Sequence, residues 1–187
     1  MSISAEEIRK RAEEIRGQIT EDRRNLHRIP ELGMDLPQTS SYIRKRLDEM
    51  GIPWQDCGGH LPEKMTKDFM EAGFPRMERA IGVTAVIGKG SPCILLRADM
   101  DALPIREESD LEFKSCNGYG HMCGHDSHAA MLLGAAQILK DMEDSLKGSV
   151  KLVFQPGEET GAGARMLVEN GLLENPKVDA AFGIHVQ

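Results

Sequence analysis

The sequence predicts an α/β fold with a central, mostly parallel or mixed sheet flanked by helices. Segments with helical periodicity alternate with short apolar, β-branched runs, which is the pattern of an α/β sheet. A length of 187 residues and an apolar fraction of 40% suit one domain with a buried core. The sequence contains no internal repeat and no low-complexity linker. We therefore expect a single structural unit.

The N-terminal part of the chain should be helical. Ser4 followed by Glu7 is a capping-box pattern, and apolar residues then recur at helical spacing to about Leu26. Residues 26–37 contain two prolines and a glycine, which should break that helix. Helical spacing resumes over residues 39–50, where we predict a second helix.

The least regular stretch is residues 57–90. Gly58-Gly59 is interpreted as a turn, apolar residues at 61, 65 and 69 suggest a short helix, and residues 81–87 have the composition of a strand. We assign no role to residues 57–80.

The C-terminal half alternates strands with helices. Strands are predicted over residues 93–96, 150–154 and 178–186, because β-branched and apolar residues cluster there. Helices are predicted from residue 128 to about 142 and over residues 164–171. The first strand leads directly into charged residues, which should lie at its C-terminal edge.

Composition excludes several classes of function. There are 23 Lys and Arg against 30 Asp and Glu, so the net charge of -7 leaves no basic surface for nucleic acid. The longest apolar run, residues 129–136, is too short to span a membrane, and the N-terminus does not resemble a secretion signal. We expect a cytoplasmic protein with no membrane partner. Its cysteines are interpreted as thiols: Cys57, Cys93, Cys116 and Cys123.

Metal-binding side chains are concentrated in residues 121–128, His-Met-Cys-Gly-His-Asp-Ser-His. Cys123, His125 and His128 supply thiolate and imidazole, which borderline-soft divalent metals prefer as ligands. Nearby glycines, among them Gly124, would let two ligands one residue apart converge. The alternative is a solvated histidine-rich loop, or a helix start whose histidines only form hydrogen bonds.

Other polar residues follow predicted strands. Asp99 and Asp101, the pair Glu158-Glu159, and His185 each lie at the C-terminal end of a predicted strand. That edge is where open α/β sheets bind ligands, so these groups should converge. Taken singly, an acidic pair at a turn is usually only solvated, and a histidine in an apolar strand is more often a core residue.

The aspartates are ambiguous from sequence. Asp99 and Asp101 could bind metal, orient a histidine ligand or cap a strand end, and Asp126 is equally ambiguous beside His125. We favour orienting roles for Asp101 and Asp126.

Five motifs, in order along the chain, resemble the M20 peptidase family, and most closely its N-acyl-amino-acid amidohydrolase branch, which includes hippurate hydrolases and auxin-conjugate hydrolases. The motifs are LHRIPELG at 26–33, LRADMDALPI at 96–105, MCGHDSH at 122–128, FQPGEE at 154–159 and GIHV at 183–186.

The resemblance implies a metal-dependent amidohydrolase. Two divalent metal ions, zinc or manganese, would be held by a set consisting of Cys123, His125, Glu159 and His185. Glu158 would be the general base, taking a proton from a water molecule that the metals acidify and passing it to the leaving amine. Cys123 would then be a ligand and not a nucleophile. The implied substrate is a small-molecule N-acyl amino acid or a similar peptide-like amide.

The resemblance also implies that more protein surrounds this site. Family members continue into a lid and dimerisation domain and then return to supply a further histidine ligand. Residues 1–187 are thus expected to form the N-terminal part of the metal-binding catalytic domain, a partial M20-type catalytic domain, of a protein that is a homo-oligomer in its full-length form. Two alternatives are a non-catalytic fragment or half of a split amidohydrolase, and a metal-storage or metal-sensing module.

Overall fold

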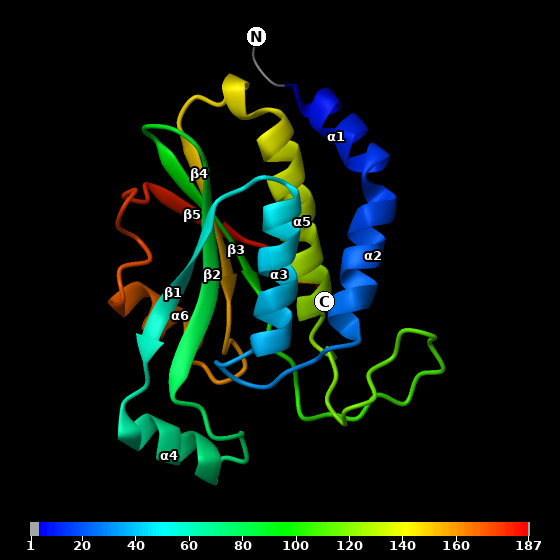
Figure 1. Cartoon of the computed structure of the whole chain (residues 1–187), viewed down its shortest axis with the longest axis vertical. Helices are drawn as coiled ribbons and strands as arrows, with labels where there is room; N and C mark the ends of the chain where they lie inside the picture. The colour runs from blue at the N-terminus through cyan, green and yellow to red at the C-terminus, as the bar shows by residue number, and fades with distance from the viewer. Residues whose placement is uncertain (1–3, 187) are drawn as a thin grey trace.

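A mixed sheet forms the centre of the computed structural model, which describes residues 4–186 (Figure 1). Within these residues the strand order is β1-β2-β4-β3-β5. β3 runs parallel to β4 and β5, whereas β2 runs antiparallel to β1 and β4. The α/β fold with a mixed sheet is therefore confirmed. The strands are β1 (Trp54–His60), β2 (Arg79–Gly88), β3 (Cys93–Asp99), β4 (Ser149–Gln155) and β5 (Ala180–Gly183).

Helices cover both faces of this sheet (Figure 1). β4 shows why both faces are apolar: Phe154 joins a core that includes Leu47 and Leu133, whereas Val153 packs with Leu167 on the opposite face. α3 and α5 thus lie against one face and α6 against the other. The helices are α1 (Ala5–Glu14), α2 (Arg16–His27), α3 (Pro37–Glu49), α4 (Glu63–Glu71), α5 (His125–Asp141) and α6 (Gly163–Glu169), with a short 3-10 helix, η1 (Glu143–Ser145).

The N-terminal helical prediction is confirmed in kind and corrected in detail. The Ser4 hydroxyl accepts a hydrogen bond from the Glu7 amide, and the Glu7 carboxylate accepts one from the Ser4 amide at 2.8 Å, so the capping box forms. The expected single helix is interrupted at Ile15, where φ is -97° and ψ is 5°, and α2 begins at the next residue.

The turn predicted at Gly58-Gly59 is wrong, because both residues lie inside β1. The sequence of β1, WQDCGGH, lacks the apolar alternation that marks a strand. Position 58 requires glycine because the backbone of the neighbouring strand comes very close to it. The φ of Gly58 is +109°, and a Cβ on this residue would lie 2.2 Å from the Ala80 carbonyl oxygen of that strand.

Two boundaries near the predicted site differ from expectation. α5 begins at His125, three residues before the predicted start, so His125 and His128 share one helix. β5 ends at Gly183 and is shorter than predicted, so His185 lies just beyond the strand.

β5 forms one edge of the sheet, and all of its residues are exposed. Phe182 is 61% exposed, and Ile184, which follows the strand, is 69% exposed. Among residues 4–186, no helix combines the length and the apolar character needed to cross a bilayer. The cysteines, all of which lie in the described range, are free thiols.

Candidate metal centre

The C-terminal ends of β3, β4 and β5 meet at one edge of the sheet because these strands run parallel. Glu158 and Glu159 follow β4, and His185 follows β5. The N-terminus of α5 points at the same edge and contributes His125. The structure therefore brings together the residues predicted from strand ends and those predicted from the Cys-His motif.

Gly124 separates the two candidate ligands Cys123 and His125. It is the N-cap of α5, with φ +82° in the left-handed region that glycine tolerates best. Because the chain turns at this residue, Cys123 and His125 can face the same point despite being so close in sequence.

Four candidate ligand atoms approach one another in two pairs. The Cys123 Sγ lies 3.5 Å from His185 Nε2, and His125 Nε2 lies 3.7 Å from Glu159 Oε1. Ligand atoms of Cys123, His125 and Glu159 all lie within 4.8 Å of one another. Thiolate, imidazole and carboxylate form a donor set suited to zinc or another borderline divalent ion.

Hydrogen bonds to the remaining atoms of these side chains leave the facing atoms free. His125 Nδ1 donates to the Asp101 carbonyl oxygen at 2.9 Å and lies 3.2 Å from Asp101 Oδ1, so the lone pair of the neutral ring is on Nε2. His185 Nδ1 donates to the Val186 carbonyl oxygen at 2.6 Å, so the lone pair of this ring is also on Nε2. Within the described chain, His125 Nε2 and Glu159 Oε1 are buried without a hydrogen-bond partner. Buried polar atoms are rarely left unpaired, so this arrangement fits a bound cation.

The local charge also favours a cation. Burial, together with the carboxylates of Glu159 and Glu158, raises the pKa of Cys123 to about 11. A thiol in this setting is a weak nucleophile at neutral pH, and a divalent ion is the partner that would stabilise its thiolate. Burial by itself lowers the pKa of His125, but the hydrogen bond to Asp101 and the charge of Asp99 outweigh it and raise that pKa.

Asp101 connects two of the candidate ligands. It is fully buried, its Oδ1 faces His125 Nδ1, and its Oδ2 accepts a hydrogen bond from the Glu159 amide at 3.0 Å. One carboxylate therefore orients the imidazole of His125 and the backbone that carries Glu159.

Residues 95–187, which carry this edge of the sheet, match the family described as peptidase family M20/M25/M40. The chain belongs to this family. Among solved structures, it is similar to the Bacillus subtilis YXEP protein, a dinuclear metal binding peptidase from the M20 family. That similarity has a TM-score of 0.76 and 36% identity, and it covers 94% of this chain and 44% of the other.

Curated relatives of this M20 chain include proteins named as amino acid conjugate hydrolases and one named as a deacetylase. The chain is 45% identical over 166 residues to IAA-amino acid hydrolase ILR1-like 5 of Arabidopsis thaliana, covering 88% of this chain and 33% of the relative. It is 42% identical over 166 residues to the N-acetyl-L-cysteine deacetylase of Bacillus subtilis (strain 168), covering 87% of this chain and 35% of that relative. This M20 chain thus spans about a third of the length of these relatives.

Contrary to the expectation from sequence, the carboxylate of Asp126 does not contact His125. Its carboxylate lies 2.7 Å from His27 Nδ1 and accepts a hydrogen bond from Arg23 Nε at 3.1 Å. The reason is helical geometry: since α5 already begins at His125, the next residue points about 100° away around the helix axis. Asp126 therefore joins α5 to α2 and does not orient a metal ligand directly.

Three other residues lie near the candidate ligands. His128 and Arg97 both contact the buried Asp99, and His121 is buried with both ring nitrogens unpaired within the described chain. Burial lowers the pKa of His121 to about 4. His128 was expected here from the Cys-His motif, whereas Arg97 and His121 were missed. Arg97 could have been found because it shares a strand face with Asp99.

Proposed function

We propose that the protein carrying this chain hydrolyses the amide bond of N-acyl amino acids or similar small peptide-like amides, using two divalent metal ions, zinc or manganese. The observation that carries this proposal is the group of ligand atoms at the strand ends, two of which are buried without partners. Two relatives support the substrate class, because their names contain an amino acid conjugate and an N-acetyl amino acid.

The four ligands we assign are Cys123, His125, Glu159 and His185. When bound, the ions would supply Lewis-acid chemistry, polarising the substrate carbonyl and making a water molecule more acidic. Asp101 holds His125 in the tautomer that leaves Nε2 free to bind, and it keeps the Glu159 backbone in place.

Glu158 is the general base in this proposal. Its side chain is 38% exposed, and its Oε2 lies 3.8 Å from His125 Nε2, so it is next to the ligands and open to substrate. No hydrogen bond to this carboxylate occurs within residues 4–186, and its oxygens are therefore available to a proton. It would take a proton from water and deliver it to the leaving amine nitrogen.

The test uses Glu158→Gln in the full-length protein and in the 187-residue chain, with metal content and hydrolysis of an N-acyl amino acid panel as the readouts. We expect Glu158→Gln to bind metal normally and to lower kcat by roughly 100-fold or more. Glu71→Gln, on the exposed face of α4, is the control and should keep full activity.

The same variant separates an enzyme from a metal-storage module. A module would keep its metal and show no hydrolysis with either variant or with the wild type. Full hydrolysis by Glu158→Gln would instead refute the assigned role of Glu158.

We also propose, from the sequence, a cytoplasmic protein that is a homo-oligomer in its full-length form. Free thiols at Cys57, Cys93, Cys116 and Cys123 support a reducing compartment. Sedimentation velocity of the full-length protein would test the oligomer, and a monomer would refute it.

A further inference from the structure

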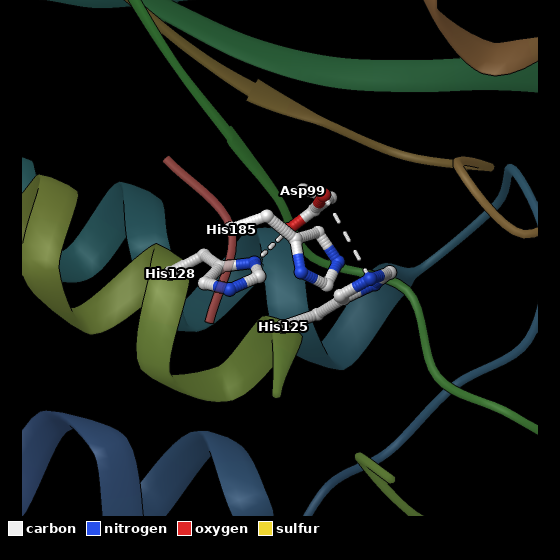
Figure 2. A group of neighbouring side chains, drawn as sticks. All are labelled: Asp99, His125, His128 and His185. Carbon is white, nitrogen blue, oxygen red and sulfur yellow. Dashed lines mark hydrogen bonds and ion pairs between the residues drawn. The ribbon is translucent and has the colours of Figure 1, made fainter. Parts of the chain in front are cut away.

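His128 lies beside the candidate ligands, in a group with Asp99, His125 and His185 (Figure 2). The ligand atoms of these residues all lie within 4.8 Å of one another, so His128 and Asp99 could be taken for metal ligands as well. Their hydrogen bonds point to a different role.

Both ring nitrogens of His128 already have partners. Nδ1 lies 2.5 Å from Asp99 Oδ1, and Nε2 lies 2.9 Å from the backbone nitrogen of Val186. A backbone N–H can only donate, so Nε2 must be the acceptor and Nδ1 must carry the proton that is donated to Asp99. In this neutral tautomer His128 has no lone pair left for a metal.

Asp99 is anchored in turn by the sheet. It is fully buried, and its Oδ2 accepts a hydrogen bond from Arg97 Nη1 at 2.6 Å. Arg97 Nε donates to Gln155 Oε1 on β4 at 2.8 Å. A continuous set of hydrogen bonds thus runs from β4 and β3 through Asp99 and His128 to the backbone of Val186.

The segment at the end of this network carries His185. His185 lies beyond β5 and is exposed, so the strand does not hold it in place. Besides the bond from Val186 to His128, the segment packs closely on the N-cap of α5: a Cβ on Gly124 would lie 2.5 Å from Val186 Cγ2. His185 Nδ1 donates to the carbonyl of the same Val186, and its Nε2 then faces Cys123 Sγ.

We propose that His128 and Asp99 are a positioning pair that fixes the Val186 backbone, and thereby aims His185 at Cys123, without binding metal themselves. This inference rests on the proposed function for its consequence, since it assumes that His185 is a ligand. The hydrogen-bond pattern of His128 itself does not depend on that assumption.

The first experiment uses the wild-type chain, labelled with ¹⁵N at histidine, and imidazole NMR before and after addition of zinc. Before zinc, His128 should be a neutral ring with the proton on Nδ1. On addition of zinc, the Nε2 resonances of His125 and His185 should move, and that of His128 should not. A zinc-induced shift of His128 Nε2 as large as that of His185 would overturn the proposal, as would the opposite tautomer in the metal-free chain.

The second experiment compares His128→Leu with His128→Gln, since glutamine keeps an acceptor for the Val186 amide. In His128→Leu, the Val186 amide should exchange with solvent faster, and zinc affinity should fall by about 10- to 100-fold with the stoichiometry unchanged. His128→Gln should recover much of both. His185→Ala is the reference for loss of a true ligand.

Two outcomes contradict the positioning role: wild-type amide exchange and zinc affinity in His128→Leu, or a loss of zinc stoichiometry equal to that in His185→Ala. If the full-length protein binds no zinc at all, the proposed function fails, and the tautomer of His128 and the exchange of the Val186 amide in the chain still decide whether the pair fixes this segment.

Discussion

Asp101 is the residue whose contacts most directly couple the two sides of the candidate metal centre. Both of its carboxylate oxygens act as acceptors, one facing His125 Nδ1 and the other bonded to the Glu159 amide. Such supporting hydrogen bonds fix the tautomer and the direction of a metal-binding histidine. The metal affinity should therefore depend on a residue that does not touch the metal.

Asp101→Asn tests this dependence at the residue scale. The amide can accept only one of the two hydrogen bonds, so we expect a loss of about 10- to 100-fold in divalent metal affinity without a change in fold. Asp110→Asn, at an exposed position of the same loop, is the control. Isothermal titration with zinc would measure both, and equal affinities would contradict the orienting role.

The element that carries Cys123 is the long connection between β3 and α5, over residues 100–124. Figure 1 shows this loop beside the C-terminal end of α2. His27, the last residue of α2, lies between two carboxylates: Nδ1 is 2.7 Å from Asp126 on α5, and Nε2 is 3.1 Å from Glu107 in the loop. The imidazole can satisfy both only as a cation that donates from both nitrogens.

The hydrogen bond to Asp126 is the main cause that raises the pKa of His27 above its ordinary 6.5, with Glu107 adding to it against the effect of burial. Two other charged or titratable groups face His27 and its two carboxylate partners. Arg23 donates a hydrogen bond to Asp126, and the ring of His121 lies beside that of His27. The stabilisation of the folded state by protonated His27 is therefore complete at a pH below the pKa of this histidine in the unfolded chain. It is lost as the pH rises through the pKa of His27 in the folded chain. The pKa values of Asp126 and Glu107 are lowered, so their contribution is lost as the pH falls into the acid range.

His27→Gln should accordingly destabilise the chain most at mildly acidic pH. We expect a loss of about 2 kcal/mol in the free energy of unfolding at about pH 6, shrinking towards about pH 9 as the wild-type imidazole loses its proton. Urea denaturation at both pH values measures it, with His60→Gln, at an exposed position of β1, as the control. A loss that grows with pH would contradict the assignment of a cationic His27.

The edge strand β1 depends on a glycine at the element scale. We expect Gly58→Ala to cost about 3 kcal/mol, since a Cβ there meets the backbone of β2 and the residue also has a positive φ. Gly51→Ala is the matched control, because Gly51 has φ +65° with nothing within 4 Å of its added Cβ, and it should cost about 1 kcal/mol. Thermal melts of both variants would compare them, and equal costs would contradict the close-approach explanation.

Elements and ligand types could be predicted from the sequence where a local pattern carries them. The apolar, β-branched segments predicted strands that end just before Glu158-Glu159 and near His185. In the structure, the parallel pairing of these strands with β3 places the three residues at one edge of the sheet. The direction of Asp126 could not be predicted, because it depends on α5 starting at His125. β1 was missed since its register on β2, and not its composition, makes it a strand. The partner of His128 is the backbone of Val186, which no side-chain pattern reveals.

On the scale of the whole molecule, the chain combines a well-packed sheet with an open edge. The central strands are covered on both faces, whereas β5 is exposed and ends next to His185. The candidate ligands Cys123, His125 and Glu159 are buried or half-buried, so their side chains should be in place before any cation binds. His185 is the exposed member, and it is the one whose position relies on backbone contacts.

The central claim is that Cys123 and its neighbours form a divalent metal site, and the absorption spectrum of the chain during titration with cobalt(II) tests it most directly. Cobalt accepts the same nitrogen, oxygen and sulfur ligands as zinc, and thiolate ligation produces a charge-transfer band. We predict this band in the wild type and in Cys116→Ser, which removes an exposed thiol of the same loop, and its absence in Cys123→Ser. A band that persists in Cys123→Ser, or stoichiometric cobalt binding by the wild type without the band, would contradict the claim.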